Sequence, residues 1–129
     1  MSGPLSPPTP SMPSDPEKLY RWLNDIHYHI AKAEAFVSDM TYDAFAGDDL
    51  RFYAVTRCPE IISEASRRLP DEFKAKYPTI KWQEMAAAGN IYRHEYDNVA
   101  PRRVWNTLTR SLPPLRDVIE HELAVLRGT

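Results

Sequence analysis

The side chains best able to do chemistry lie in one stretch, residues 89–96, which reads GNIYRHEY. It holds a histidine, His94, beside a permanent cation, Arg93, with the amide of Asn90 one helical turn earlier. Histidine is the side chain best placed to move protons near neutral pH, and arginine can bind a phosphate and offset the charge that develops on it. His94 could deprotonate a ribose 2′-hydroxyl or protonate a leaving oxygen, so the pair suits RNA cleavage without a metal ion. By composition alone the same stretch also fits a solvated helix end.

The other histidines and the cysteine do not form a recognisable metal or nucleophile motif. His27 and His29 are two positions apart and therefore face different directions on a helix, which makes them a poor metal pair. His121 lies between two glutamates, as on a solvated helix face. Cys58 is the one cysteine, so an internal disulfide and a cysteine-based zinc site are both excluded. We therefore expect neither a metal centre nor a bound cofactor.

The length and charge of the chain narrow the class of protein. With 129 residues it suits a single domain, and its net charge of −2 argues against a general nucleic-acid coat protein or a polybasic membrane binder. The charge is uneven, because residues 89–116 hold five arginines and two acids, which keeps RNA among the candidate ligands. We expect a cytoplasmic protein without membrane contact, since we find neither a secretory signal nor an apolar run of roughly 20 residues.

Residues 1–14 differ in composition from the rest of the chain. Five of the twelve prolines fall within residues 1–13, with serine, threonine and glycine between them. Such a stretch has little apolar surface to bury. We expect a disordered, proline-rich tail over residues 1–14 and one helical domain over residues 15–129, with a docking motif for a proline-reading domain as the less favoured alternative for the tail.

The elements that must position residues 89–96 are helices. Apolar residues recur at three- and four-residue steps along four stretches, and an alternating strand pattern of useful length is missing. This predicts an all-α fold, an up-and-down bundle of four long helices. Capping and breaking residues give the expected limits of these helices: Ser14 or Asp15 to 39–41, Asp48 or Asp49 to Pro70, Thr79 to the turn at 97–99, and Pro101 to Gly128.

Three positions inside these helices are unusual. Pro59 removes a backbone donor from the second helix, and we expect a kink there. Pro113 and Pro114 break the apolar pattern of the last helix. Gly89 costs about 1 kcal/mol relative to alanine in the third helix, so it needs either a packing reason or a history of losing its side chain.

Over most of residues 17–127 the chain resembles the HepT-like toxins of the HEPN superfamily. The family pattern is an Arg-Asn pair, three residues, then His-x-Tyr, followed by a Val-Trp pair and a Leu-Pro break. The matching residues here are Asn90, His94, Tyr96, Val104-Trp105 and Leu112-Pro113. Upstream, residues 60–65 and 68–70 look like the family's second helix and its exit.

The resemblance implies a metal-independent endoribonuclease, the toxin of a toxin–antitoxin module. His94 would be the acid–base group and Asn90 a positioning residue. It also implies a homodimer, with the two histidine motifs near a common cleft. The implied partner is a nucleotidyltransferase antitoxin that can transfer AMP to Tyr96, where the added bulk and negative charge would block an RNA phosphate.

One departure from the family pattern concerns the catalytic cation. The family arginine falls on Gly89, and losing such a contact would cost on the order of 10²–10³ in rate. Arg93 is adjacent to His94 in sequence but points about 100° away from it around a helix. Arg93 could still supply the catalytic cation if two chains meet at the site or if the helix ends before His94. Arg57 or Arg51 on the second helix could approach instead.

Glu64, in the second-helix motif, could hydrogen-bond across to Asn90 or His94, although such a glutamate is more often merely exposed. Three functions therefore stay open. The first is a ribonuclease completed by an arginine from elsewhere. The second is a catalytically inactive HEPN dimer that binds RNA, a nucleotide or the nucleotidyltransferase partner, with a purely scaffolding bundle as a third.

Overall fold

A computed structural model describes residues 15–91 and 99–128, all of them in helices or the short turns between helices. The predicted tail, residues 1–14, lies outside the described residues. The helices are α1 (Pro16–Val37), α2 (Tyr42–Ala46), α3 (Asp49–Arg68), α4 (Asp71–Ala75), α5 (Trp82–Ile91), α6 (Val99–Asn106), the π-helical segment η1 (Thr107–Ser111) and α7 (Leu112–Gly128). Neither described range contains a strand, which confirms the all-α prediction.

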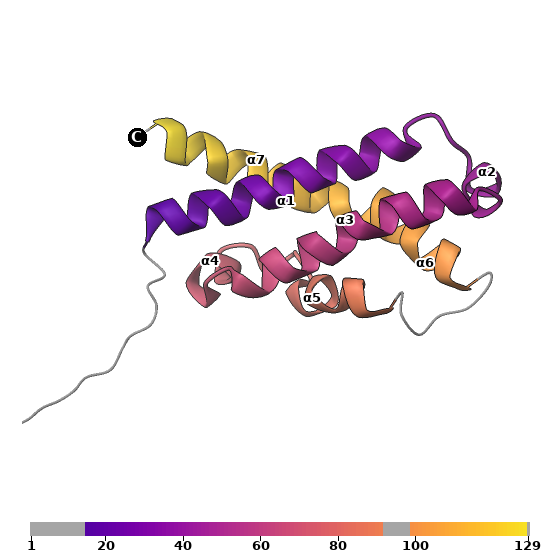
Figure 1. Ribbon diagram of the computed structural model, residues 1–129. Coiled ribbons are helices and arrows are strands. Elements are labelled where there is room, and N and C mark those ends of the chain that lie inside the picture. The colour runs from indigo at the N-terminus through magenta and orange to yellow at the C-terminus, as the bar shows by residue number, and fades with distance from the viewer. Residues whose placement is uncertain (1–14, 92–98, 129) are drawn as a thin grey trace, which may run out of the picture.

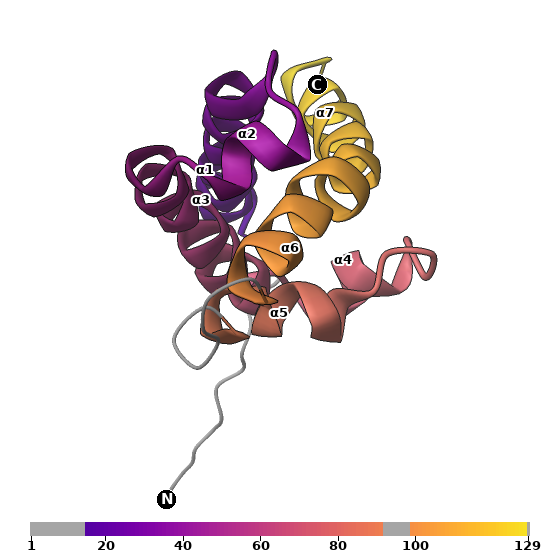
Figure 2. The ribbon, with the colours of Figure 1, turned by 90° about the vertical axis from the view of Figure 1, so that its right-hand side faces the viewer.

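The four long helices are α1, α3, α5 and the rod made by α6, η1 and α7. Figure 1 shows the chain reversing direction from each of these to the next, as an up-and-down bundle requires. α1 packs between α3 and α7, and α5 packs on α3. Viewed along the bundle, α7, α1 and α3 form an arc, and α5 lies below α3 (Figure 2). Two short helices, α2 and α4, lie in the connections between the first and second and between the second and third of the predicted helices.

Two aspartates start the longest helices in the expected way. Asp15 accepts hydrogen bonds from the backbone N–H groups of Glu17 (3.0 Å) and Lys18 (3.2 Å), and Pro16 occupies the first helical position. Asp48 accepts one from the N–H of Arg51 (2.9 Å). Each carboxylate satisfies a donor that the helix itself leaves unpaired, and its charge suits the positive end of the helix dipole.

The prediction that Thr79 caps the third helix is wrong. α5 begins at Trp82, because the indole Nε1–H of that residue donates to the carbonyl oxygens of Lys74 and Tyr77, both at 3.1 Å. These bonds hold residues 77–80 in turns, one of them closed by the Ile80 N–H on Tyr77 O at 3.1 Å. The helix therefore starts later than the residue types suggested.

One apolar core joins the long helices. Its fully buried side chains come mainly from α1, α3 and the α6–α7 rod: Leu23, Ile26, Ile30, Val55, Ile62, Val104, Leu112, Leu115, Ile119 and Leu123, with Phe45 from α2. The three tryptophans, Trp22, Trp82 and Trp105, are partly buried against this core. None of the described helices is long and apolar enough to cross a membrane.

The proline pair changes the last helix without ending it. Pro113 and Pro114 have no N–H, so the carbonyls of Thr109 and Arg110 cannot receive the usual α-helical hydrogen bonds from them. The chain widens into the π-helical η1 immediately before them, and the Leu112 N–H donates to the carbonyl of Thr107. The predicted break is thus a change of hydrogen-bond pattern within a continuous rod. Pro59 is buried within an uninterrupted α3, and a kink there stays a prediction.

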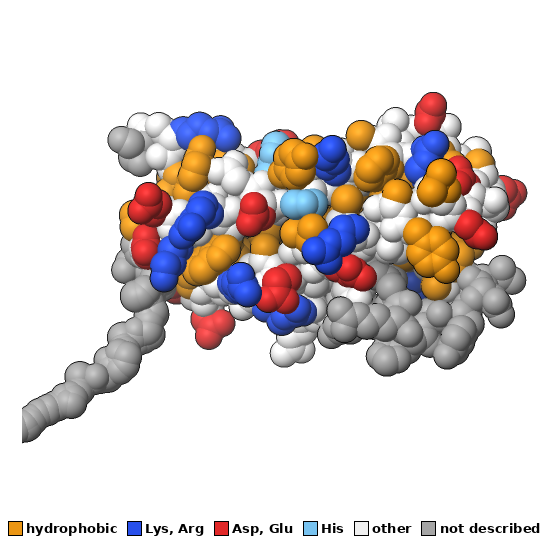
Figure 3. Space-filling model, in the orientation of Figure 1, with side chains coloured by type: hydrophobic (Ala, Val, Ile, Leu, Met, Phe, Trp, Pro, Cys, Tyr) orange, Lys and Arg blue, Asp and Glu red, His pale blue; other side chains and the backbone are white. Residues whose placement is uncertain are grey.

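Several large apolar side chains are exposed on α1 and α3. Tyr28 is 55% exposed, Tyr53 70% and Leu50 83%. On the face drawn in Figure 3, hydrophobic side chains are scattered among cations and carboxylates instead of forming one broad patch. The homodimer that the resemblance implies stays a prediction.

A buried carboxylate fastens the turn after α4 to α7. Glu122 is only 7% exposed, and it accepts a hydrogen bond from the Tyr77 hydroxyl while Lys76 Nζ lies 3.2 Å from Glu122 Oε2. Burial, with the hydrogen bond to Glu122 and its negative charge, raises the pKa of Tyr77 to about 12. A carboxylate in the interior is stable only with such partners.

We predict that Tyr77→Phe lowers the free energy of unfolding by about 1–3 kcal/mol near neutral pH, because it leaves the buried Glu122 one donor short. The pH dependence should change as well. An unfolded tyrosine has a pKa of about 10, so the native preference for neutral Tyr77 stabilises the fold fully below that pH. This stability is lost as the pH rises from about 10 toward the native pKa of about 12.

Urea unfolding of the wild type at a series of alkaline pH values should therefore give a steep loss of stability, and Tyr77→Phe a shallower one. Tyr53→Phe is the matched control, since Tyr53 is 70% exposed and should leave the profile unchanged. Equal slopes for all three proteins would contradict the role given to Tyr77.

Candidate functional site

The described part of the predicted site is the platform that carries its catalytic segment. Arg93, His94 and Tyr96 lie outside the described residues, and so does the side chain of Asn90 in the last turn of α5. What the structure places is Gly89, at the end of α5, against the middle of α3. The position and direction of α5 decide where the segment after it starts.

One serine fixes that position. Ser63 on α3 is 1% exposed, and its hydroxyl donates to the carbonyl of Met85 (2.8 Å) while accepting from the N–H of Gly89 (2.9 Å). These two backbone groups are four residues apart, so they are the pair that an α-helix normally joins directly. The Ser63 hydroxyl on α3 therefore bonds to the acceptor and to the donor of one helical turn of α5. These two bonds fix the position of α5 along α3.

Gly89 has a packing reason to be glycine. A Cβ atom at this position would lie 3.0 Å from the Cα of Glu60 and 3.3 Å from the Oγ of Ser63. Ordinary van der Waals contacts of a Cβ are 3.4–4 Å, so a larger residue would require the helices to move apart. Of the two explanations for this glycine, the structure supports close packing.

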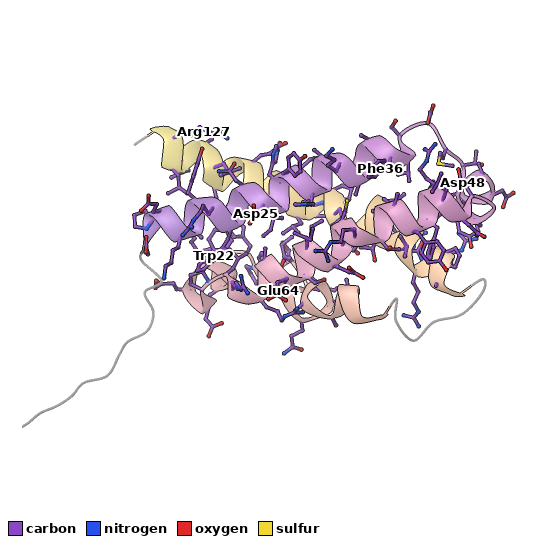
Figure 4. The ribbon with its side chains drawn as sticks, in the orientation of Figure 1. Trp22, Asp25, Phe36, Asp48, Glu64 and Arg127 are labelled. Atoms are coloured by element: carbon purple, nitrogen blue, oxygen red, sulfur yellow. The ribbon has the colours of Figure 1, made fainter. Side chains whose placement is uncertain are left out.

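Beside Gly89 lies a hollow of about 200 Å³, here called the Gly89 hollow, lined on the α3 side by Arg57, Glu60, Ile61, Ser63, Glu64 and Arg67. It brings together three positions singled out in the sequence: Gly89, Arg57 and Glu64. Figure 4 shows Glu64 where α3 runs beside α5. The hollow holds two guanidinium groups and two carboxylates, so it is polar on the side that faces the end of α5.

The two carboxylates are held by arginines of their own helix. Glu60 Oε1 lies 3.2 Å from Arg57 Nη1, and Glu64 lies 2.6 Å from Arg67 and 2.9 Å from Arg68. The hydrogen bond and charge of Arg67, with the charge of Arg68, hold the pKa of Glu64 below its usual range. Glu64 is therefore ionised at neutral pH, and the contact with Asn90 or His94 stays a prediction.

Arg67 is the cation that links α3 to α5. Besides its bond to Glu64, it donates from Nη1 to the carbonyl of Ala86 at 2.5 Å. Residue type and spacing did not single out Arg67 or Ser63. The one signal for Ser63 was its place among the buried positions of α3, next to Ile62 and before Ala65. A small polar residue in an apolar stripe requires a partner, and here that partner is the backbone of α5.

Of the two α3 arginines expected to approach the site, Arg57 lines the Gly89 hollow and Arg51 does not. Arg51 donates to the carbonyl of Phe36 and lies 3.3 Å from the Sδ of Met40. Figure 4 shows Phe36 on the part of α1 that leads to α2, away from Glu64. Arg51 therefore holds the turn between α1 and α3.

His27 and His29 make contacts on the surface of the helices. His27 Nε2 lies 3.0 Å from Glu120 Oε2 and links α1 to α7. His29 Nδ1 lies 2.8 Å from the carbonyl oxygen of Asp25 in its own helix. Within residues 15–91 and 99–128, three or more histidine, cysteine or acidic side chains nowhere group closely enough to hold a metal ion.

Comparison with known proteins gives consistent matches. Residues 26–122 match the family described as "Ribonuclease HepT-like". A Thermococcus cleftensis protein named "Probable ribonuclease HepT" is 35% identical over 99 residues, which cover 77% of this chain and 90% of that one. A Methanocaldococcus jannaschii protein whose name describes it as a putative RNase is 33% identical over 114 residues, covering 88% and 94% of the two chains. No solved structure matches.

We predict that Gly89→Ala destabilises the fold by about 1–3 kcal/mol, because the added methyl group meets the backbone of α3. Helix propensity alone predicts the opposite, a gain of about 1 kcal/mol. Urea unfolding distinguishes the two. Gly128→Ala is the matched control, since a Cβ there would meet nothing within 4 Å. A Gly89→Ala variant more stable than the wild type would rule out the close-packing explanation.

Proposed function

This chain belongs to the HepT-like ribonuclease family, and from that membership we propose that it is an endoribonuclease toxin that cleaves RNA without a metal ion. The observation that carries the proposal is the family match over residues 26–122, which spans the platform of α3 and α5 and the motif residues Asn90, His94 and Tyr96. The polar Gly89 hollow beside that motif adds support.

In the proposed reaction His94 takes the proton of a ribose 2′-hydroxyl, and the 2′-oxygen attacks the adjacent phosphorus. The bond from phosphorus to the 5′-oxygen breaks. The products are a 2′,3′-cyclic phosphate on one fragment and a 5′-oxygen on the other, and this oxygen takes up a proton as it leaves. Asn90 orients the phosphate, and a guanidinium offsets the charge that accumulates on its oxygens.

We propose Arg57 as that guanidinium. Arg57 lines the same hollow as Gly89, and Gly89 is the residue that stands where the family pattern has its arginine. Its ion pair with Glu60 is 3.2 Å long and the Arg57 side chain is 71% exposed, so exchanging Glu60 for a phosphate costs little. Arg67 is less free to bind a phosphate, because it is bonded to both Glu64 and the carbonyl of Ala86. Arg93 is the second candidate for this role.

A specific observation favours the alternative of an inactive HEPN dimer that binds RNA, a nucleotide or a nucleotidyltransferase. The contact of Gly89 with Glu60 and Ser63 leaves no room for the family arginine at position 89. With a glycine packed this closely against α3, a cation for catalysis has to come from another position. Binding and catalysis must therefore be measured separately.

We further propose that the chain is a homodimer regulated by a nucleotidyltransferase antitoxin. The Tyr96 hydroxyl oxygen would attack the α-phosphorus of ATP, forming an AMP ester and releasing pyrophosphate. Incubation with the active partner and ATP should then add the mass of one or more adenylyl groups to the wild-type chain and none to Tyr96→Phe. An unmodified wild type beside a demonstrably active partner would contradict this regulation.

For the reaction itself, we predict that the purified chain cuts single-stranded RNA in the presence of EDTA and that His94→Ala abolishes cutting. Arg57→Gln should lower kcat by about 10²–10³ with little change in KM, because the lost contact acts mainly on the transition state. Arg57→Lys should recover part of this loss by restoring the charge.

The matched control is Arg68→Gln, which removes an arginine from the same helix, outside the Gly89 hollow. It should cut at the wild-type rate. A silent wild type that still binds RNA would favour the inactive dimer. Equal losses in the Arg57 and Arg68 variants would remove the role given to Arg57.

A further inference from the structure

A second hollow lies along α5. It has a volume of about 680 Å³ and shares no lining residue with the Gly89 hollow. Its walls include Lys81, Glu84 and Ala88 on the α5 side, and Arg103, Arg110 and Ser111 on the facing rod of α6, η1 and α7. We call it the α5–η1 groove. Its volume falls in the range of about 300–1,000 Å³ that is typical of ligand sites.

The sequence explains why this groove is open. α5 packs mainly on α3, and the residues it turns toward η1 include the small Ala87 and Ala88, which leave the space between the helices unfilled. On the other wall, Pro113 and Pro114 force the wide π-helical turn of η1, which puts Arg110 and Ser111 on the groove. π-Helical turns of this kind are frequent at functional sites.

The charge of the groove is strongly biased. Lys81, Arg103 and Arg110 face one carboxylate, that of Glu84. Four arginines outside this groove, Arg57, Arg67, Arg68 and Arg116, are each paired with a carboxylate, as Arg116 is with Glu34 at 2.5 Å. Within the described residues, Lys81 and Arg110 take part in none of the ion pairs. A concave surface with an excess of one charge focuses its field on a ligand of the opposite charge.

The placement of the groove relative to the catalytic segment points to the ligand. Lys81 stands immediately before α5, and the same helix leads to Gly89 and then to Asn90 and His94. Eight helical steps of about 1.5 Å separate Lys81 from Gly89, roughly 12 Å along the axis. This equals about three to four nucleotides of a stacked strand at 3.4 Å each. A strand held at the catalytic segment can therefore run into the groove.

We propose that the α5–η1 groove binds the phosphate groups of the RNA strand beyond the bond that is cut. The inference rests on the proposed function, since RNA is the substrate in both. Lys81 and Arg110 neutralise successive phosphates from opposite walls, and the Ser111 hydroxyl donates to a phosphate oxygen. The groove would thus set how long an RNA must be to bind well, while the catalytic segment sets where it is cut.

The test is the affinity of the full chain for a 12-nucleotide RNA with 2′-O-methyl groups at every position, measured by fluorescence anisotropy. Such an RNA cannot be cut, so binding is separated from catalysis. We expect the double variant Lys81→Gln/Arg110→Gln to bind about tenfold or more weakly. Its slope of log affinity against log salt should fall by about 1.4, as expected for two lost contacts to single-stranded RNA.

Lys18→Gln/Arg21→Gln is the matched control, because it removes the same charge from exposed positions of α1 outside the groove. It should leave both the affinity and the slope near the wild-type values. Glu84→Gln should increase the affinity for RNA several-fold, because it removes the one carboxylate that lines the groove. Urea unfolding midpoints within the wild-type range establish that each variant is folded.

Equal losses in the two double variants, or no loss in either, would overturn the proposal. The proposal would also be overturned if ATP binding depended on Lys81 and Arg110 and RNA binding did not, because the groove would then be a nucleotide site.

Cleavage of unmodified RNA by the wild type separates this proposal from the proposed function. If the wild type cuts and the groove variant binds normally, only the groove proposal fails. If the wild type is silent and the groove variant loses binding, the groove proposal stands without the nuclease.

Discussion

The hydroxyl of Ser63 is the contact on which the position of α5, and with it the proposed functional site, depends. It reaches from the centre of α3 to the Met85 carbonyl and the Gly89 N–H. Because Gly89 lacks a Cβ, the two helices approach closely enough for one hydroxyl to serve both backbone groups. The bond from Arg67 to the Ala86 carbonyl adds a second tie on the same side of α5. Together these contacts fix the helix that precedes the segment proposed to be catalytic.

The same close approach shapes the charge around that segment. With α5 seated on α3, the arginines of α3 border the Gly89 hollow, while the other side of α5 remains separated from η1. The two hollows differ in their balance of charge. In the first, Arg57 and Arg67 are paired with carboxylates of their own helix, whereas in the second the cations outnumber the one carboxylate. Under the proposed function, an RNA phosphate would have to displace a carboxylate in the first hollow. In the second, Lys81 and Arg110 take part in none of the ion pairs of the described residues.

Much of the fold was readable from residue types and spacing. The apolar periodicity gave four long helices, and the caps at Asp15 and Asp48 and the proline effect near residue 113 follow local rules that the structure obeys. Thr79 failed as a cap because the Trp82 indole bonds to the carbonyls of Lys74 and Tyr77, and single-residue capping preferences do not show such side-chain contacts. The role of Gly89 depends on a helix that is distant in sequence. Composition could not separate a missing arginine from a close contact, since that distinction lies in the distance to Glu60.

The packing of α1 against α7 has a consequence for the way the chain folds during synthesis. The core needs Leu23, Ile26 and Ile30 from the first helix and Leu115, Ile119 and Leu123 from the last described one. The ion pairs of His27 with Glu120 and of Arg116 with Glu34 join the same two helices. Such contacts between distant parts of the chain form slowly. On the ribosome, part of the apolar faces of α1 and α3 therefore stays uncovered until α7 emerges, so the synthesis of α7 controls when the bundle can fold cooperatively.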